Sequence, residues 1–502
     1  MSFNLATVLR ESTLAHPDKP LLLVGPHVLT YAQVDEMTGR VASGLRAAGL
    51  APGDRIALQL PNVPEFVLTF FGALKAGLTV VPMNPLLKAP EVAYHLTDSS
   101  ARLLVTHEAF AGEALRGATD AGAVRVLVVG AAPEGTEPFD QLLGHPGSDD
   151  VEQLGADDTA VVIYTSGTTG RPKGAMLTHF QMYMAATIGG ETFGYRDDDV
   201  GIAVLPLFHV FGLSSVMNTA IRYGASLVLV PRFDPGAVLD AIERHRATVF
   251  CGVPTMFVAL LHADLTGRDV SSLRVCVSGG ASIPGEVLAG FEAAFPGAPV
   301  LEGYGLSETC ALATFNRSVD ERRVLSIGKR MWGMEVRVVD ADDRELPPGR
   351  DHVGELVLRG HNVMKGYLDR PEATEEAMRG GWFHTGDLGY ADEDGFLYIV
   401  DRKKDLVIRG GFNVYPREVE EVLHEHPAVK EAAVVGRPDP RLGEEVVAFV
   451  ALRPRADAAP EEVVAFCRER LAAYKYPREV VVLDDLPKGA SGKVLKTELR
   501  AR

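Results

Sequence analysis

A strand-like apolar run that leads directly into a loop of glycines and hydroxyls constrains this chain more than any other feature. The run is Ala160–Ile163, and residues 164–174 continue as Tyr-Thr-Ser-Gly-Thr-Thr-Gly-Arg-Pro-Lys-Gly. Glycines allow backbone N–H groups to approach a ligand, and hydroxyls, Arg171 and Lys173 can donate hydrogen bonds to phosphate oxygens. An isolated Gly/Ser/Thr loop is more often a polar turn, but eleven consecutive residues of this composition favour a polyphosphate site.

This loop is not the Walker A loop of P-loop ATPases. That motif, G-x-x-x-x-G-K-[ST], requires glycine where Pro172 stands. The sequence therefore predicts that a nucleotide is held in a different way.

Alternating strand and helix patterns follow one another along the first 300 residues. Thr30 is placed to cap a helix that ends at Gly49, and the apolar strand Arg55–Leu60 comes next. Pro133–Asp150 reads as a polar loop. Further strands are predicted at Leu103–Thr106, Val124–Val129, Val200–Leu205, Ser226–Val230, Thr248–Gly252 and Leu273–Ser278. This alternation is typical of βαβ units and parallel sheets.

The pattern changes in the last third of the chain. Short strands at Glu335–Val339 and Gly354–Leu358 indicate a small β subdomain. A charged break over 402–405 precedes a final α/β unit of about 100 residues. The predicted fold class is thus α/β. We expect a large N-terminal domain (1–401) with two parallel-rich α/β sheets plus the β subdomain, a hinge at 402–405, and a smaller mobile α/β C-terminal domain (406–502).

Composition excludes several classes of protein. The 502 residues are 46% hydrophobic and 23% charged, which is typical of soluble globular proteins. The net charge of −17, from 50 basic and 67 acidic residues, argues against a nucleic-acid partner. The four cysteines contain no C-x-x-C pair, so neither a zinc site nor a disulfide framework is indicated. We expect no signal peptide, no transmembrane segment and a cytoplasmic location.

Three further segments carry chemistry, although each has an ordinary structural explanation. In the run 302–309, Tyr304 can stack on a purine, Glu308 can bind Mg²⁺ and Thr309 can reach a phosphate, but a turn before a helix fits equally well. Asp387 can accept hydrogen bonds from ribose hydroxyls, yet Asp after Gly is usually a turn residue. Lys493 follows a flexible turn, where an isolated lysine is usually solvated.

Taken together and in this order, the segments resemble the adenylate-forming superfamily, which includes acyl-CoA synthetases, firefly luciferase and peptide adenylation domains. The resemblance covers nearly the whole chain and is greatest to bacterial fatty-acyl-CoA synthetases. It rests on residues 164–174, 206–212, 303–309, 385–387, 401–411 and 491–493.

The resemblance implies roles for residues whose chemistry permits them. Lys493, His209, Glu308 and Thr165 would be catalytic, with Thr165 and Glu308 at the metal. The nucleotide would contact Thr165, Ser166, Gly167, Thr168, Thr169, Gly170, Lys173, Gly280, Ala281, Glu302, Gly303, Tyr304, Gly305, Thr309, Asp387 and Arg402. The acyl pocket would include Phe208, Phe211, Val216, Gly303, Gly305, Cys310 and Ala311. Lys404 would be the hinge residue, and Gly410, Gly411 and Phe412 would line the CoA channel.

The implied reaction uses ATP, Mg²⁺ and CoA to activate a carboxylic acid as acyl-AMP and to pass the acyl group to CoA. A medium- or long-chain fatty acid is the first expectation, because the candidate pocket residues are apolar or small. An aryl or cinnamoyl acid is an alternative. So are transfer to an amine or carrier protein, activation of a non-carboxylate oxyanion, and a nucleotide-binding pseudo-enzyme. A homodimer is left open.

Overall fold

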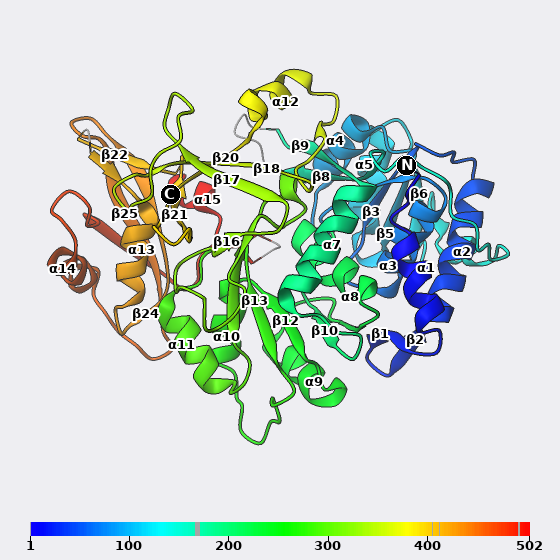
Figure 1. Cartoon of the computed structure of the whole chain (residues 1–502), viewed down its shortest axis with the longest axis horizontal. Helices are drawn as coiled ribbons and strands as arrows, with labels where there is room; N and C mark the ends of the chain where they lie inside the picture. Colours follow the sequence, from blue (N-terminus) through cyan, green and yellow to red (C-terminus); the bar gives the residue numbers. More distant parts are fainter. Residues whose placement is uncertain (1, 166–170, 404, 411, 490–491) are drawn as a thin grey trace.

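The computed structural model describes residues 2–165, 171–403, 405–410, 412–489 and 492–502. Figure 1 shows a first sheet in blue and cyan on the right, a second in green in the middle, and the orange-to-red C-terminal domain on the left. This arrangement confirms the predicted α/β class, with a large N-terminal domain and a smaller C-terminal one.

One strand of the first sheet, β8, leads into the glycine- and hydroxyl-rich loop. The central strands of this sheet are parallel, whereas β9 runs back antiparallel along β8 and pairs antiparallel with β19. In order across the sheet, its strands are β19 (Gly366–Tyr367), β9 (Lys173–Thr178), β8 (Thr159–Thr165), β4 (Thr79–Pro82), β3 (Arg55–Gln59), β5 (Leu103–His107), β6 (Arg125–Val129) and β7 (Glu137–Pro138). The helices of this half are α1 (Thr7–Ala15), α2 (Tyr31–Ala47), α3 (Pro64–Lys75), α4 (Ala89–Ser99), α5 (Ala111–Asp120) and α6 (Asp140–Leu143).

The helix boundaries follow from local chemistry. The Thr30 hydroxyl accepts a hydrogen bond from Gln33 N (3.3 Å), and Thr30 N donates to Gln33 Oε1 (2.8 Å), which forms the capping box that starts α2. Gly49 follows the end of α2 with φ +86°, a conformation that favours glycine. Pro64 occupies the first turn of α3, where a missing N–H costs nothing.

The second sheet combines residues 200–330 with the N-terminal hairpin. Strand β1 pairs in parallel with β11, so residues 20–30 complete a sheet built from the middle of the chain. In order, its strands are β16 (Lys329–Arg330), β15 (Thr314–Phe315), β14 (Val300–Tyr304), β13 (Val275–Ser278), β12 (Val249–Gly252), β10 (Val200–Ala203), β11 (Ser226–Leu229), β1 (Pro20–Val24) and β2 (His27–Thr30). Its helices are α7 (His179–Phe193), α8 (Thr219–Arg222), α9 (Pro235–His245), α10 (Pro254–Leu261) and α11 (Gly285–Ala294), with a π-helix at Phe211–Asn218.

The β subdomain and the C-terminal domain complete the chain. The β subdomain is an antiparallel sheet with the strand order β17 (Met334–Val339), β18 (Gly354–Gly360), β20 (Phe383–Ala391) and β21 (Leu397–Arg402). The short helix α12 (Pro371–Ala377) lies just before β20 in the sequence. The C-terminal domain contains β23 (Phe412–Val414), β22 (Val407–Arg409), β25 (Gly443–Leu452), β24 (Val429–Asp439), β26 (Glu479–Leu483), α13 (Pro416–His424), α14 (Pro460–Arg470) and α15 (Lys496–Arg500), and it buries its own apolar clusters.

Two local predictions were wrong in part. Pro133–Asp150 is not entirely loop, because Glu137–Pro138 pairs with β6 as β7 and Asp140–Leu143 forms α6. The predicted loop after Ile163 ends at Lys173, where β9 begins. Strand β9 was missed because Lys173 and Gly174 are poor strand formers in isolation, and pairing with β8 overrides that preference.

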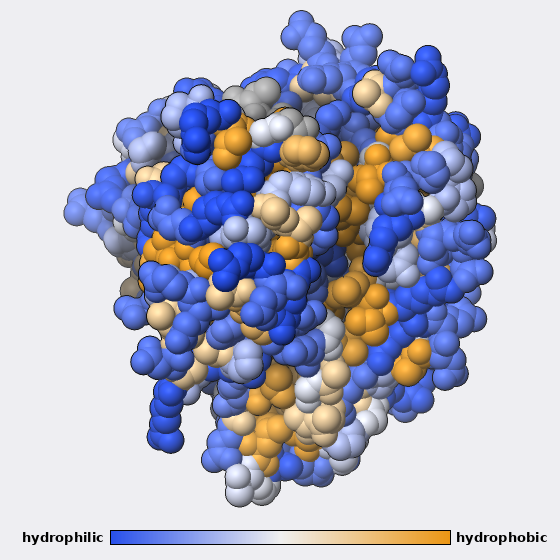
Figure 2. All heavy atoms as spheres, turned by 90° about the vertical axis from the view of Figure 1, so that its left-hand side faces the viewer, coloured by the Kyte–Doolittle hydropathy of each residue, from blue (hydrophilic) through white to orange (hydrophobic). Residues whose placement is uncertain are grey.

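No helix formed by the described residues is long and apolar enough to cross a bilayer. Figure 2 looks onto the side that carries the C-terminal domain, where the surface is mainly hydrophilic and hydrophobic residues gather in a few hollows and bands.

One buried amide joins the two large sheets. Asn62, which follows β3, donates to the carbonyls of Ala203 (2.8 Å) and Leu205 (2.9 Å) and accepts from Leu207 N (2.9 Å). Its side chain thus fixes the segment that leads from β10 to His209. All three hydrogen bonds are buried, so none of these backbone groups has water as a substitute.

We predict that Asn62→Ala lowers the free energy of unfolding by about 3 kcal/mol, because two carbonyls and one N–H lose their partners. Thermal and urea unfolding measure this loss. Replacement of the exposed Asn413 by alanine is the matched control and should change stability by less than about 0.5 kcal/mol. Equal stability of the two variants would contradict the bridging role of Asn62.

Candidate active site

Three predicted nucleotide residues come together although they are far apart in the sequence. Tyr304 ends β14, Asp387 lies on β20, and Arg402 ends β21. The Tyr304 hydroxyl donates to Asp387 Oδ2 (2.6 Å), and Arg402 Nε lies 2.9 Å from Asp387 Oδ1. Burial, together with the neighbouring Asp387 charge, raises the pKa of Tyr304 well above its usual value, so Tyr304 remains a donor. Asp387 is thereby held at a fixed position with its partners on two other strands.

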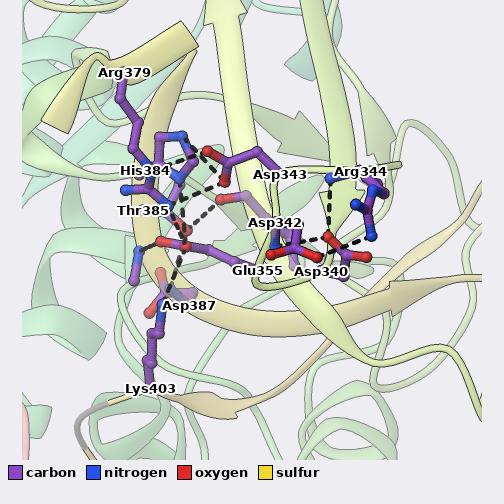
Figure 3. Close-up of polar contacts among 12 residues, drawn as sticks. Asp340, Asp342, Asp343, Arg344, Glu355, Arg379, His384, Thr385, Asp387 and Lys403 are labelled. Carbon is purple, nitrogen blue, oxygen red and sulfur yellow. Dashed lines mark hydrogen bonds and ion pairs between the residues drawn. The ribbon is translucent and has the colours of Figure 1, made fainter. Parts of the chain in front are cut away.

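A buried carboxylate, Glu355, contacts the turn that precedes Asp387 (Figure 3). Glu355 Oε1 accepts from Gly386 N (3.0 Å), and Oε2 lies 3.3 Å from His384 Nδ1 and 3.6 Å from Lys403 Nζ. Burial raises the pKa of Glu355, but the Gly386 and His384 hydrogen bonds and the Lys403 charge outweigh it, and the net shift is downward. Glu355 therefore connects the turn before Asp387 to Lys403, beside the predicted hinge.

A second group gathers at the start of the glycine- and hydroxyl-rich loop. Tyr367 donates to Glu308 Oε1 (3.0 Å), and the Thr165 hydroxyl also hydrogen-bonds to Glu308. Lys173 Nζ lies 5.3 Å from the centre of the Tyr367 ring. Burial raises the pKa of Glu308, against the opposing effect of these hydrogen bonds. Ser166, Gly167, Thr168, Thr169 and Gly170 fall outside the described residues.

The residues of this second group fit magnesium. Mg²⁺ is commonly held by one or two carboxylates together with substrate phosphates, and Glu308 with Thr165 offers one carboxylate and one hydroxyl. In the described part of the chain no group of three His, Cys, Asp or Glu side chains could hold a metal by itself. Glu308 and Thr165 thus fit a magnesium site in which the phosphates of the substrate supply further ligands.

The predicted adenine residues lie at the carboxyl ends of adjacent strands. Strands β13 and β14 are parallel and pair Ser278 with Glu302, so Gly280 and Ala281 end beside Glu302–Gly305, where ligands bind in sheets of this kind. Glu302 is buried and accepts from Ser282 (3.0 Å). Burial raises its pKa to about 7 in spite of the nearby Arg417 charge. Arg417 from α13 donates to the same Ser282 hydroxyl, so the C-terminal domain contacts this region.

Thr309 forms a local turn in this structure. Its hydroxyl accepts from Leu306 N (2.9 Å) and donates to Leu306 O (3.2 Å), and the side chain is fully buried. In this structure Thr309 therefore closes the turn that aims Glu308. Its role at the phosphate stays a prediction.

Several of the candidate acyl-pocket residues pack closely against their neighbours. A Cβ at Gly279 would lie 3.0 Å from the Phe211 ring, and one at Gly305 would lie 2.2 Å from the Ala311 backbone. Cys310 and Ala311 take φ values of +51° and +74°, which non-glycine residues rarely adopt. Val216 and Cys310 are buried, Phe208 is half-buried, and a Cβ at Gly303 would lie 2.5 Å from the Phe315 ring.

The C-terminal domain delivers Lys493 to this region. The Thr255 hydroxyl donates to Gly492 O (3.1 Å), and Gly489 N donates to Lys493 O (2.8 Å) within the turn that carries the lysine. Burial, and then the charge of Lys493, lowers the pKa of His209 to about 4. His209 is therefore neutral and lies within electrostatic range of a lysine from the other domain.

Gly410 and Phe412, two of the predicted CoA-channel residues, contact other residues of the C-terminal domain. Gly410 N donates to Leu442 O, and Phe412 stacks on Tyr474 with ring centres 4.8 Å apart, so both rest on the C-terminal domain. Phe412 is 57% exposed and Ile408 on the same hairpin is 53% exposed. Lys404 and Gly411 lie outside the described residues.

Comparison with known families decides the class. The AMP-binding enzyme model matches residues 9–368, and the AMP-binding enzyme C-terminal domain model matches residues 418–493. The chain belongs to the AMP-binding enzyme family. This confirms the predicted class, an AMP-forming ligase of the acyl-CoA synthetase type, so the reading as a non-catalytic pseudo-enzyme is not supported.

Relatives of this AMP-binding enzyme act on different acids. It is 37% identical to a long-chain-fatty-acid–CoA ligase of Bacillus subtilis (strain 168), over 99% of this chain and 94% of the relative. It is 39% identical to a feruloyl-CoA synthase of Amycolatopsis sp, over 95% and 94%. The crystal structure of the anthranilate CoA ligase AuaEII with anthranoyl-AMP aligns with a TM-score of 0.93 and 30% identity, over 100% of this chain and 97% of that one. Acyl- or aryl-CoA ligase chemistry through an adenylate is therefore supported, and the substrate class is unresolved.

We predict that Glu302→Gln makes the stability of this enzyme less dependent on pH. A carboxyl with a folded pKa of about 7 and an unfolded pKa near 4.3 stabilises the fold at low pH, and this stability is lost as the pH rises through 7. Glutamine mimics the protonated form, so the decrease in unfolding free energy from pH 5 to pH 8 should be smaller by a few kcal/mol, at about 1.36 kcal/mol per pKa unit.

Unfolding at pH 5, 6, 7 and 8 measures this difference. Asp401, whose pKa burial raises to about 6, changes stability in the same direction and is present in both proteins. Parallel pH profiles for wild type and Glu302→Gln would show that Glu302 is already ionised in the folded state.

Proposed function

We propose that this enzyme activates a carboxylic acid with ATP, releases pyrophosphate, and transfers the acyl group from acyl-AMP to CoA. One observation carries the proposal. The turn that carries Lys493 is docked on the N-terminal domain through the Thr255–Gly492 hydrogen bond, and the Lys493 charge acts on His209, while Tyr304 and Asp387 pair on the same domain. A cation of the C-terminal domain is thereby held against the domain that carries the candidate ribose, metal and acyl-chain residues.

In the first step the substrate carboxylate attacks the α-phosphorus, and the bond to the leaving pyrophosphate breaks. Carboxylates are ionised at pH 7, so no general base is required. Negative charge develops on the phosphoryl oxygens, and Lys493 would stabilise it, a contribution of about 10²–10³ in rate for one such donor. Asp387 and Arg402 would hold the ribose, and His209 would flank the acyl pocket. Mg²⁺ on Glu308 and Thr165 would supply charge stabilisation at the phosphates.

In the second step the CoA thiol attacks the acyl carbonyl and AMP leaves. We propose that the C-terminal domain turns about 402–405, with Lys404 as hinge residue, and exchanges Lys493 for the hairpin of Gly410, Gly411 and Phe412. The exposure of Ile408 and Phe412 supports this, because large apolar side chains at a hairpin tip are commonly covered in another state.

A medium- or long-chain fatty acid is the favoured substrate. The residues that would surround the acyl chain are apolar or small, and the Bacillus subtilis relative is named for long-chain fatty acids. The specific alternative is an aryl or cinnamoyl acid, since the feruloyl-CoA synthase is similar over 95% of the chain. Gly303 and Gly305, both packed against neighbouring groups, could flank a flat ring as well as a chain.

We predict that pyrophosphate release is fastest with medium- and long-chain fatty acids and that thioester appears only with CoA. The test measures pyrophosphate for aliphatic, aromatic and inorganic acids, with CoA, amines and holo-carrier protein as acceptors. Faster release with cinnamates or benzoates would select the aryl alternative. Product formed with an amine or a carrier protein in place of CoA would overturn the proposed acceptor.

We predict that Lys493→Ala reduces acyl-adenylate formation by about 10²–10³, since one charge-stabilising donor is lost, and largely spares thioester formation from supplied acyl-AMP. Pyrophosphate exchange and a thioester assay measure the two half-reactions separately. Lys488→Ala is the matched control, because Lys488 lies in the same segment but pairs with Glu431 (2.8 Å), and it should retain both activities. Equal losses in both half-reactions of Lys493→Ala would exclude the assigned role.

A further inference from the structure

A cationic surface pocket lies beside the candidate metal site, and of its lining residues Lys173 alone is among the expected nucleotide contacts. Its volume is about 490 Å³, and we call it the outer anion pocket. It lies between α4, the start of β9 and the start of α12, which Figure 1 places next to each other at the top. The pocket is lined by Tyr94, Arg171, Pro172, Lys173, Arg370, Glu372, Ala373 and Glu376.

Two of the three cations of this pocket, Arg171 and Lys173, are oriented by aromatic rings. Arg171 lies over the Tyr94 ring (5.6 Å to the centre) and Lys173 over the Tyr367 ring (5.3 Å). A cation–π contact positions a cation but leaves its charge available to an anion. Neither Arg171 nor Lys173 forms an ion pair with a residue that the structure describes.

Arg370, the third cation, is held differently. Arg370 pairs with Asp98 Oδ1 (2.5 Å), and the other Asp98 oxygen accepts from the Tyr164 hydroxyl (2.8 Å). The aromatic and acidic side chains of α4 and β8 thus set Arg370 at the rim. The Arg370 side chain stays 44% exposed, so it can meet a ligand that enters from solvent.

The outer anion pocket shares a wall with the candidate metal site. Lys173 pairs with Thr165 across β8 and β9, and the Tyr367 ring beneath Lys173 carries the hydroxyl that binds Glu308. An anion that leaves the Glu308 side past Lys173 therefore enters a space lined by Arg171 and Arg370. The first step of the proposed reaction releases an anion of this kind, a diphosphate with several negative charges.

We propose that the outer anion pocket is a product site that receives pyrophosphate after the bond to the α-phosphorus has broken, with Arg370 as the cation specific to this stage. The proposal rests on the proposed function. Glu372 and Glu376 in the same lining oppose tight retention of a polyanion, which suits a site on the way out. ATP bound for reaction would depend on Lys173 and the neighbouring loop, and much less on Arg370.

Calorimetric titration of the full chain with pyrophosphate, and separately with ATP, tests this proposal without turnover. Arg370→Gln should raise the Kd for pyrophosphate about tenfold, the order expected for one lost charge-assisted hydrogen bond, and the Kd for ATP less than threefold. Arg370→Lys, which keeps the charge, should stay within about threefold of wild type for both. An unchanged pyrophosphate Kd in Arg370→Gln would overturn the product site. So would equal losses for pyrophosphate and ATP.

Asp98→Asn separates anion binding from a structural role of Arg370. This variant removes the carboxylate that Arg370 pairs with but retains the cation, so pyrophosphate should bind as tightly as to wild type or more tightly. Weakening equal to that of Arg370→Gln would mean that the ion pair matters only for the fold of the rim, and would overturn the proposal. Because binding is measured directly, these outcomes are independent of whether any tested acid supports pyrophosphate release, which is the test of the proposed function.

Discussion

The hydrogen bond between Thr255 and Gly492 is the contact on which the arrangement of the candidate site depends. It joins a helix of the second sheet to the turn before Lys493, two segments 237 residues apart. Gly492 takes φ +79°, and a Cβ there would lie 3.0 Å from Val253 and 3.2 Å from Thr255, so the turn packs closely on α10. Without this docking the lysine would remain on a separate domain, and the carboxyl ends of β13 and β14 would form a nucleotide platform that lacks its cation.

The register between neighbouring strands positions the candidate ribose-binding residues. Pairing of β20 with β21 sets Asp387 opposite Arg402, and the end of β14 brings Tyr304 against the same carboxylate. Glu355 then fixes the turn before Asp387 from the neighbouring strand. The ribose candidates are thus positioned by backbone geometry and a second layer of hydrogen bonds, which is how sites reach the precision that catalysis requires.

Much of the fold could be predicted from sequence because its signals are local. Apolar runs and the Thr30 cap mark elements whose existence depends on a few neighbouring residues, and the structure confirms them. The partners of each strand carry no such signal. Local periodicity predicts neither the place of β1 in the second sheet nor the antiparallel pairing of β9 with β8. Both depend on hydrogen bonds to other strands.

The same distinction applies to the site. Tyr304, Asp387 and Glu308 were found because they lie in segments with unusual composition or in a family motif. Asn62, Glu355 and Arg370 were missed, because each is a single polar residue whose importance comes only from the elements that fold against it. A buried polar side chain with partners on several elements can be recognised in a structure, but a single sequence gives no signal for it.

The position of β1 has a consequence for biosynthesis. Leu22 and Leu23 of β1 pair with Leu227 and Val228 of β11. About 200 further residues must therefore be translated before β1 can pair with β11. Sheets closed by such distant segments form slowly and expose apolar strands meanwhile. The first half of the nascent chain therefore emerges with an unpaired strand edge, which stays open to contact with other chains until the residues of β11 have been synthesised.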